Sequence, residues 1–168
     1  MAAPMVAAAA ALVRHLNPDM PAVEIVRVLK QTARRPPGTG WTPELGWGIL
    51  DAGTALAVAR TLDRRPPRSN MRVLPRRTRR SALTLRWRGG DVPRPGVAES
   101  GVAGFELWRS VDGRAPRRLL STPLRARRVR LQRGHRYAFF TIAVDRAGNR
   151  ELAPKVADVR LTVRRRSR

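Results

Sequence analysis

The sequence predicts a mixed fold, with helices over residues 1–62 and an all-β antiparallel sandwich over residues 81–164. Three observations support this division. Apolar residues recur with a helical period in the first segment and alternate, as strands do, in the second. Residues 63–80 between them are rich in proline and arginine, which is typical of a linker with an edge strand. The charge is also uneven, because residues 1–60 carry 6 basic and 4 acidic side chains whereas residues 61–168 carry 29 and 8. Residues 165–168 form a basic tail.

The first expected helix is the alanine-rich segment from Met5 to Leu16. It follows Pro4, which suits a first helical turn because that position needs no N–H donor. Asn17 and Pro18 form its stop signal, because asparagine tolerates the left-handed conformation of a helix cap and proline cannot continue a helix.

Two more helices are expected before the linker. Asp19 is expected to cap the second, which ends at "RRPPGTG", and Asp51 the third, which runs to about Arg60. The second helix carries polar residues at helical spacing, and its apolar residues are expected to fill a wide buried arc. These apolar residues are Val23, Ile25, Val26, Val28 and Leu29.

Beyond the linker, short strand-like segments are separated by turn signals such as "RGGD", "VDGR", "QRGH" and "RAGN". Regular short strands within about 100 residues favour an antiparallel sandwich. The expected strands are Ala82–Trp87, Gly104–Val111, Arg127–Gln132, Arg136–Val144 and Val156–Val163.

Composition excludes several kinds of site. The chain has no cysteine, so disulfides, thiolate zinc sites and a cysteine nucleophile are ruled out, and we expect no cofactor or metal. No apolar run reaches the about 18 residues of a membrane span, so no transmembrane segment is expected. The first basic residue, Arg14, follows the apolar run rather than preceding it, which argues against a signal peptide.

Three segments of the helical part, in order, resemble subtilisin-like serine peptidases. "MAAPMVAAAAAL" resembles the helix that follows the catalytic serine in that family, "NPDMPAVEIVRVLKQTA" the next helix, and "GWGILDAGTAL" the closing element. The resemblance implies the C-terminal helices of a truncated α/β domain, so Met1 is expected to be an internal methionine of a longer peptidase. It also implies a parent enzyme that is extracellular or in the cell envelope, and that hydrolyses protein or peptide substrates through an acyl-enzyme.

The same resemblance leaves no catalytic residue in this sequence. It places the nucleophilic serine immediately before Met1, and the aspartate and histidine further upstream. Met1, Ala2, Ala3 and Pro4 are therefore expected to be flanking scaffold, and the chain alone is expected to be inactive. The two histidines, His15 at a helix end and His135 in a turn, are expected to be structural.

The second region resembles a fibronectin type III or related immunoglobulin-like module. Trp87 matches the core tryptophan of an early strand, and Tyr137 the corner tyrosine whose hydroxyl bonds back to the backbone. Such modules carry no chemistry of their own.

The arginine excess leaves an alternative function open. All basic residues except Lys30 and Lys155 are arginine, a bias that GC-rich coding produces without selection for a partner. Arg86 and Arg88 share one strand face, as do Arg128 and Arg130, and both pairs are expected on solvated faces. The alternative is a non-enzymatic basic module that binds an anionic polymer of the cell surface or, less favoured, nucleic acid. Aromatic side chains for stacking bases do not accompany the basic runs.

Overall fold

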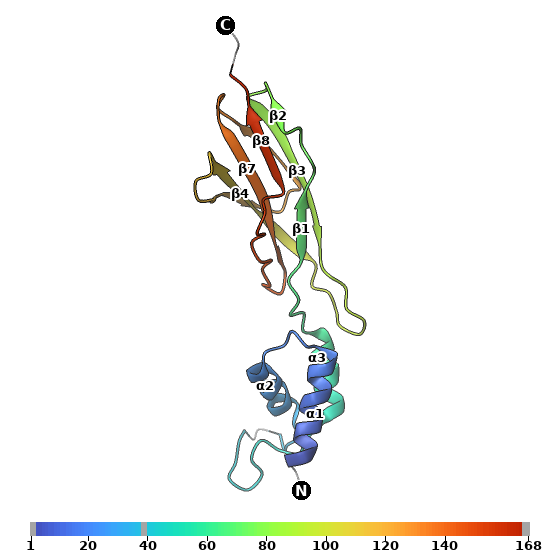
Figure 1. Ribbon diagram of the computed structural model, residues 1–168. Helices are drawn as coiled ribbons and strands as arrows, with labels where there is room; N and C mark the ends of the chain where they lie inside the picture. Colours follow the sequence, from blue (N-terminus) through green and yellow to red (C-terminus); the bar gives the residue numbers. More distant parts are fainter. Residues whose placement is uncertain (1–2, 38–39, 166–168) are drawn as a thin grey trace. The chain divides into compact units, whose positions relative to one another are not determined.

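The computed structural model describes residues 3–37 and 40–165, and over them it shows helices followed by strands (Figure 1). The chain divides into two compact units. The first, unit 1, comprises Met1–Arg65 together with Pro93–Glu99, and unit 2 comprises Pro66–Val92 together with Ser100–Arg168. No described helix is long and apolar enough to cross a membrane.

Unit 1 is built from α1 (Ala3–Leu16), α2 (Ala22–Thr32) and α3 (Ala52–Thr61). Its core consists largely of small and β-branched side chains, which let the helices approach one another closely. The buried members are Ala9, Val13, Met20, Ile25, Val28, Leu29, Ala55 and Ala59.

The helix ends of unit 1 confirm one expected cap and correct two. Asp51 caps α3, because its Oδ1 accepts a hydrogen bond from the Thr54 N–H at 2.9 Å. Asp19 does not cap α2, whose N-cap is Pro21; the Asp19 carboxylate instead lies 3.3 Å from the Arg94 guanidinium.

Asn17 is not left-handed either. Its N–H continues the α1 pattern by donating to the Val13 carbonyl at 2.9 Å, and its buried side-chain amide donates to the carbonyls of Ala59 and Leu62 at the end of α3. A residue expected to stop one helix therefore satisfies the open carbonyls of another.

Unit 2 is a sandwich of two sheets. The three-stranded sheet has the order β1-β3-β6 and the five-stranded sheet the order β2-β8-β7-β4-β5. The strands are β1 (Arg68–Met71), β2 (Arg77–Thr78), β3 (Ala82–Gly90), β4 (Val102–Val111), β5 (Arg117–Thr122), β6 (Ala126–Arg130), β7 (Arg136–Asp145) and β8 (Val159–Val163). This order, with the first strand divided between the two sheets, is that of an immunoglobulin-like sandwich, so the expected architecture is confirmed.

The strands differ from the sequence expectation at several of their ends, for example β3, which continues to Gly90, and in the following details. β5 was not expected, because "RRLLST" does not alternate; it forms by pairing with β4 across the Asp112–Gly113 turn. The last strand begins at Val159 rather than Val156. β2 runs parallel to β8, so the sandwich is not wholly antiparallel. The strands β3 to β7 lie between β2 and β8 in the sequence. Because no short hairpin joins β2 to β8, these two strands can pair in parallel.

The two aromatic signals in the sandwich are confirmed. Trp87 is buried and meets Phe105 edge-on, with ring centroids 6.3 Å apart. The Tyr137 hydroxyl accepts a hydrogen bond from the Gln132 N–H at 2.8 Å and lies 3.4 Å from the carbonyl of the same residue. These contacts make the corner that the sequence predicted.

Two carboxylates link β1 to β7, strands that belong to different sheets. Glu151 accepts hydrogen bonds from the N–H and hydroxyl of Ser69 and from the Ala143 N–H. Asp158 accepts one from the Thr141 N–H of β7 at 3.2 Å and another from the Met71 backbone of β1. Since β8 pairs with β7 only as far as Phe139, these carboxylates satisfy N–H groups that the sheet leaves open.

Part of the loop between β3 and β4 packs in unit 1 rather than with the sandwich strands. The Ala98 N–H donates to the Arg60 carbonyl at 2.7 Å, and the Arg65 guanidinium donates to the Pro93 carbonyl at 3.2 Å. With the contact between Arg94 and Asp19, these bonds tie residues 93–99 to the turn between α1 and α2 and to the C-terminal end of α3.

Candidate functional site

The candidate site is the start of α1 and the elements that support it. Of the four expected scaffold residues, Met1 and Ala2 lie outside the described residues. Ala3 and Pro4 begin α1, and both are exposed.

The first turns of α1 are apolar and exposed around the whole helix, and Ala11 and Leu12 extend this exposed surface toward the middle of the helix. Only Ala9 and Val13 of this helix are buried. Met5 is 67% exposed and Leu12 51% exposed. A contiguous apolar surface of this kind marks a place where another polypeptide surface packs. We call it the α1 apolar face; its residues are Ala3, Pro4, Met5, Val6, Ala7, Ala8, Ala11 and Leu12.

The segment "GWG" holds the loop before α3 against the end of α2. Arg34 and Ile49 exchange two backbone hydrogen bonds, at 2.8 and 2.9 Å. Gly48 lies between them with φ +105, and a Cβ on it would fall 2.5 Å from the Arg34 carbonyl oxygen. This position therefore requires glycine for both its conformation and its space. Trp47 lies under the Lys30 ammonium, 4.8 Å from ring centroid to nitrogen.

Gly48→Ala is expected to destabilise unit 1 by about 1 to 2 kcal/mol. The new methyl group must displace the Arg34 carbonyl, and the alanine backbone must keep a positive φ that is strained for a residue with a side chain. Chemical denaturation followed by helical circular dichroism measures the change. Gly40→Ala is the matched control, since Gly40 has no atom within 4 Å of its Cβ position. Equal stability of the two variants would show that the backbone hydrogen bonds between Arg34 and Ile49 do not require glycine at position 48.

α2 carries a buried ion pair where a polar face was expected. Glu24 is buried, and its carboxylate accepts two hydrogen bonds from the Arg64 guanidinium, the Nε bond being 2.6 Å long. The exposed Arg27 guanidinium adds a third bond at 2.8 Å. The hydrogen bond from Arg64 is the main reason that the pKa of Glu24 lies below its ordinary value.

The expected wide apolar arc of α2 is wrong. Val23 is 77% exposed and Val26 47% exposed. α2 buries only the stripe that meets the other helices, which is Ile25, Val28 and Leu29 beside Glu24. Val23 and Val26 therefore add exposed apolar surface to unit 1, as the α1 apolar face does.

The described residues contain no triad of serine, histidine and aspartate. His15 is exposed in the last turn of α1. In unit 2, His135 Nδ1 lies 2.6 Å from Asp112 Oδ2, but the neighbouring Ser110 hydroxyl donates to the Arg114 carbonyl instead. The pKa of Asp112 is lowered, first by the hydrogen bond from the Arg136 N–H and then by His135. His135 therefore has a carboxylate that orients its ring, but the Ser110 hydroxyl does not bond to it as a nucleophile would.

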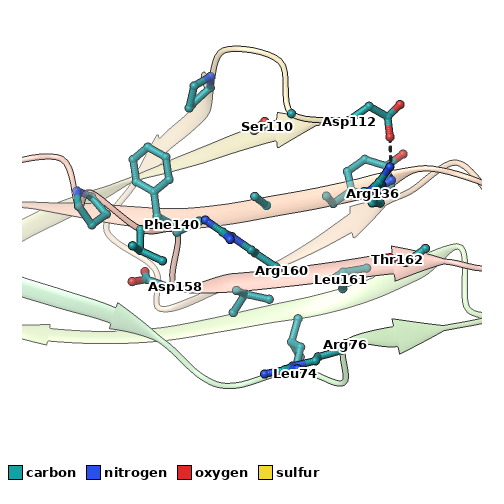
Figure 2. Close-up of a pocket in the computed structure, with 18 of the residues that line it drawn as sticks. Leu74, Arg76, Ser110, Asp112, Arg136, Phe140, Asp158, Arg160, Leu161 and Thr162 are labelled. Atoms are coloured by element: carbon teal, nitrogen blue, oxygen red, sulfur yellow. Dashed lines mark hydrogen bonds between the residues drawn. The ribbon is translucent and has the colours of Figure 1, made fainter.

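A groove of about 1150 Å³ crosses the sandwich near β7 and β8 (Figure 2). Figure 2 shows Phe140 and Arg160 projecting into it from these neighbouring strands. Asp158 lies at its edge, and burial is the main reason that the pKa of this carboxyl is raised. The basic residues that line the groove are Arg76, Arg77, Arg114, Arg136, Lys155 and Arg160, and its carboxylates are Asp112 and Asp158.

Comparison with known proteins supports the helical part most directly. Residues 1–48 match the model of the subtilase family. This match includes the "GWG" glycines and ends before Asp51. No curated protein matches the chain.

Among solved structures, the chain is similar to the fibronectin(III)-like modules of CbhA from Clostridium thermocellum. The sequence identity is 13% and the TM-score 0.41, over 60% of this chain and 47% of that one. The chain thus spans about half the length of that structure. The sandwich itself is established by its strand order and its tyrosine corner. The molecule therefore joins a helical segment similar to the subtilase family, residues 1–48, to an immunoglobulin-like sandwich.

Proposed function

We propose that unit 1 is the C-terminal part of a subtilisin-like serine endopeptidase domain, and that the catalytic serine, histidine and aspartate belong to polypeptide preceding Met1. The observation that carries this proposal is the family match over residues 1–48 on a helix whose apolar face is exposed. A helix that packs inside a larger α/β domain needs such a face, whereas a helix on the surface of a small helical unit does not.

In the complete domain, α1 supports the nucleophile. The serine would attack a peptide carbonyl, the histidine would take its proton, and an acyl-enzyme would form and then be hydrolysed. The first turn of α1 has backbone N–H groups without helical partners, and they favour negative charge at that end. Ala3 and the residues around it thus hold the serine and its N–H in position rather than react.

The chain alone is proposed to be inactive as a peptidase. Its serines are Ser69, Ser81, Ser100, Ser110, Ser121 and Ser167. None of those within the described residues donates its hydroxyl to a histidine. By family resemblance, the complete enzyme would work outside the cell or in the cell envelope.

The first experiment is to sequence the DNA upstream of the Met1 codon and to express the extended polypeptide. We expect an open frame that reads Gly-Thr-Ser immediately before Met1. We also expect the extended protein to react stoichiometrically with a fluorophosphonate serine probe, while residues 1–168 do not react. A closed frame, or labelling of residues 1–168 alone, would contradict the proposal.

The second experiment tests the α1 apolar face in the extended protein. Met5→Glu and Leu12→Glu place a charge on side chains that are exposed here, so the stability of residues 1–168 should change by less than about 0.5 kcal/mol. In the extended protein the same charges should be buried without partners and should abolish probe labelling. Arg14→Glu, exposed on the same helix, is the control and should retain labelling. Retained labelling in all three variants would show that nothing covers this face.

A further inference from the structure

One outer face of the sandwich carries a dense set of arginines. It is the solvent side of the sheet β1-β3-β6, and we call it the arginine face. All of its arginines are exposed; they are Arg68, Arg72, Arg86, Arg88, Arg128 and Arg130.

Strand register places these residues on one surface. In β3, Leu85 and Trp87 face the core, so Arg86 and Arg88 face solvent. On one side of β3, Thr84 pairs with Arg128 and Ala82 with Arg130.

On the other side of β3, Asn70 pairs with Arg88 and Arg68 with Gly90. The Arg72 N–H donates to the Arg86 carbonyl, which extends the same register by one pair. The two arginine pairs that the sequence showed on separate strands therefore lie on adjacent strands of one sheet.

No carboxylate balances this charge within the sheet. β1, β3 and β6 contain no aspartate or glutamate. Within the described part of the chain, none of the six guanidinium groups forms a salt bridge. The hydrogen bond from Arg88 Nε to Asn70 Oδ1, 3.3 Å long, joins two residues of the face itself. Like charges on adjacent strands repel, and a bound polyanion would relieve that repulsion.

The spacing suits a polymer with repeated anionic groups. Alternate residues on a strand lie about 6.8 Å apart, and neighbouring strands about 5 Å apart. The face thus presents guanidinium groups in a flat array, and each can bind a sulfate, phosphate or carboxylate with two parallel hydrogen bonds.

We propose that the arginine face binds a linear anionic polysaccharide. Nucleic acid fits less well, because sheet surfaces that hold single strands stack bases on exposed aromatic side chains. The residues between the arginines are small or polar instead, namely Asn70, Ala82, Thr84 and Ala126. The aromatic side chains of the described sandwich are buried or half-buried. This inference is independent of the proposed peptidase role.

The groove on the other sheet provides a matched control. It contains as many basic residues as the arginine face, but Asp112 and Asp158 lie among them. Removing four charges from each place gives two proteins with the same net charge. A difference between them reports where the polymer binds rather than how basic the protein is.

The test measures heparin binding to the full chain at several salt concentrations. The face variant carries Arg86→Gln, Arg88→Gln, Arg128→Gln and Arg130→Gln. We expect it to bind heparin at least 100-fold more weakly than the parent at physiological salt. The slope of log K against log salt should fall by about 3, as four lost anion contacts imply. The groove variant carries Arg76→Gln, Arg77→Gln, Arg114→Gln and Arg160→Gln and should lose less than fivefold.

A charge-preserving set of substitutions keeps the proposal testable if the glutamine variant folds poorly. Arginine to lysine at the same four face positions retains the charge and loses the two-pronged geometry, so affinity should fall about tenfold with little change in salt slope. Alginate, which carries only carboxylates, should compete with heparin. Equal losses in the face and groove variants would overturn the proposal. Tighter binding of single-stranded oligo(dT) than of heparin at matched charge would overturn it in favour of nucleic acid.

Discussion

Phe139→Ala is expected to destabilise the sandwich by about 3 to 5 kcal/mol while leaving the helical unit unchanged. Phe139 is fully buried at the middle of β7 and stacks on Tyr137, with ring centroids 6.1 Å apart. Its removal leaves a cavity between two sheets whose backbones are held by ladder hydrogen bonds and so cannot close it. A loss of this size is a large part of the stability of a domain of about 100 residues.

Tryptophan fluorescence separates the two units when Trp41→Phe and Trp47→Phe are also introduced, because these two tryptophans belong to unit 1. Trp87 is buried in the sandwich core, so its emission shifts to the red when unit 2 unfolds. Helical circular dichroism follows unit 1, whose core shares no residue with the sandwich core. Leu152→Ala is the control, because Leu152 is 85% exposed and should change stability by less than about 0.5 kcal/mol. An equal shift of both transitions in Phe139→Ala would mean that the units unfold together.

Glu24→Gln is expected to destabilise unit 1 by about 2 to 3 kcal/mol near neutral pH. The substitution leaves the Arg64 guanidinium, mostly buried, facing an amide that can accept only one of its hydrogen bonds. Arg27→Gln removes the exposed partner of the same carboxylate and should cost less than about 0.5 kcal/mol. Similar losses of unfolding free energy in the two variants would show that the buried contact with Arg64 contributes no more to stability than the exposed contact with Arg27.

The destabilisation caused by Glu24→Gln should decrease as the pH falls. Hydrogen bonds from Arg64 lower the pKa of Glu24 in the folded protein. The pair therefore stabilises unit 1 fully above the ordinary glutamate pKa of about 4.3, and this contribution is lost as the pH falls through the folded pKa. The stability difference between wild type and Glu24→Gln should shrink below about pH 4. A difference that stays constant down to that pH would contradict the assignment of the charge.

The sequence predicts the structure correctly where the deciding contact is between residues close together in the chain. Asp51 caps α3 because its side chain reaches an N–H only three residues away. Tyr137 makes the corner with Gln132, five residues away. Alternation identified most strands because one face of each sheet packs against the core.

The failures share a different cause, which is that the deciding partner is distant in the sequence. Glu24 is buried because Arg64 lies 40 residues later, and Asn17 turns its amide toward the end of α3. No periodicity within α2 could reveal such a partner. The wide arc of α2 was expected from the apolar residues of the helix alone, and within the described residues unit 1 has no sheet that would bury Val23 and Val26. The arginine face was equally hidden, because strand pairing alone brings β3 and β6 together.

The loop that joins β3 to β4 bears on how this protein can be taken apart. Because residues 93–99 cluster with unit 1, the chain passes from one unit to the other three times rather than once. A single protease cut after Arg65 therefore yields two pieces that remain associated, since the longer piece still carries the loop bound to Arg60 and Asp19. Moving the sandwich onto another protein at a cut in the linker would likewise carry away a loop that had packed elsewhere. The sandwich is thus a poorly interchangeable module, and an excised version is best made with this loop shortened to a plain hairpin.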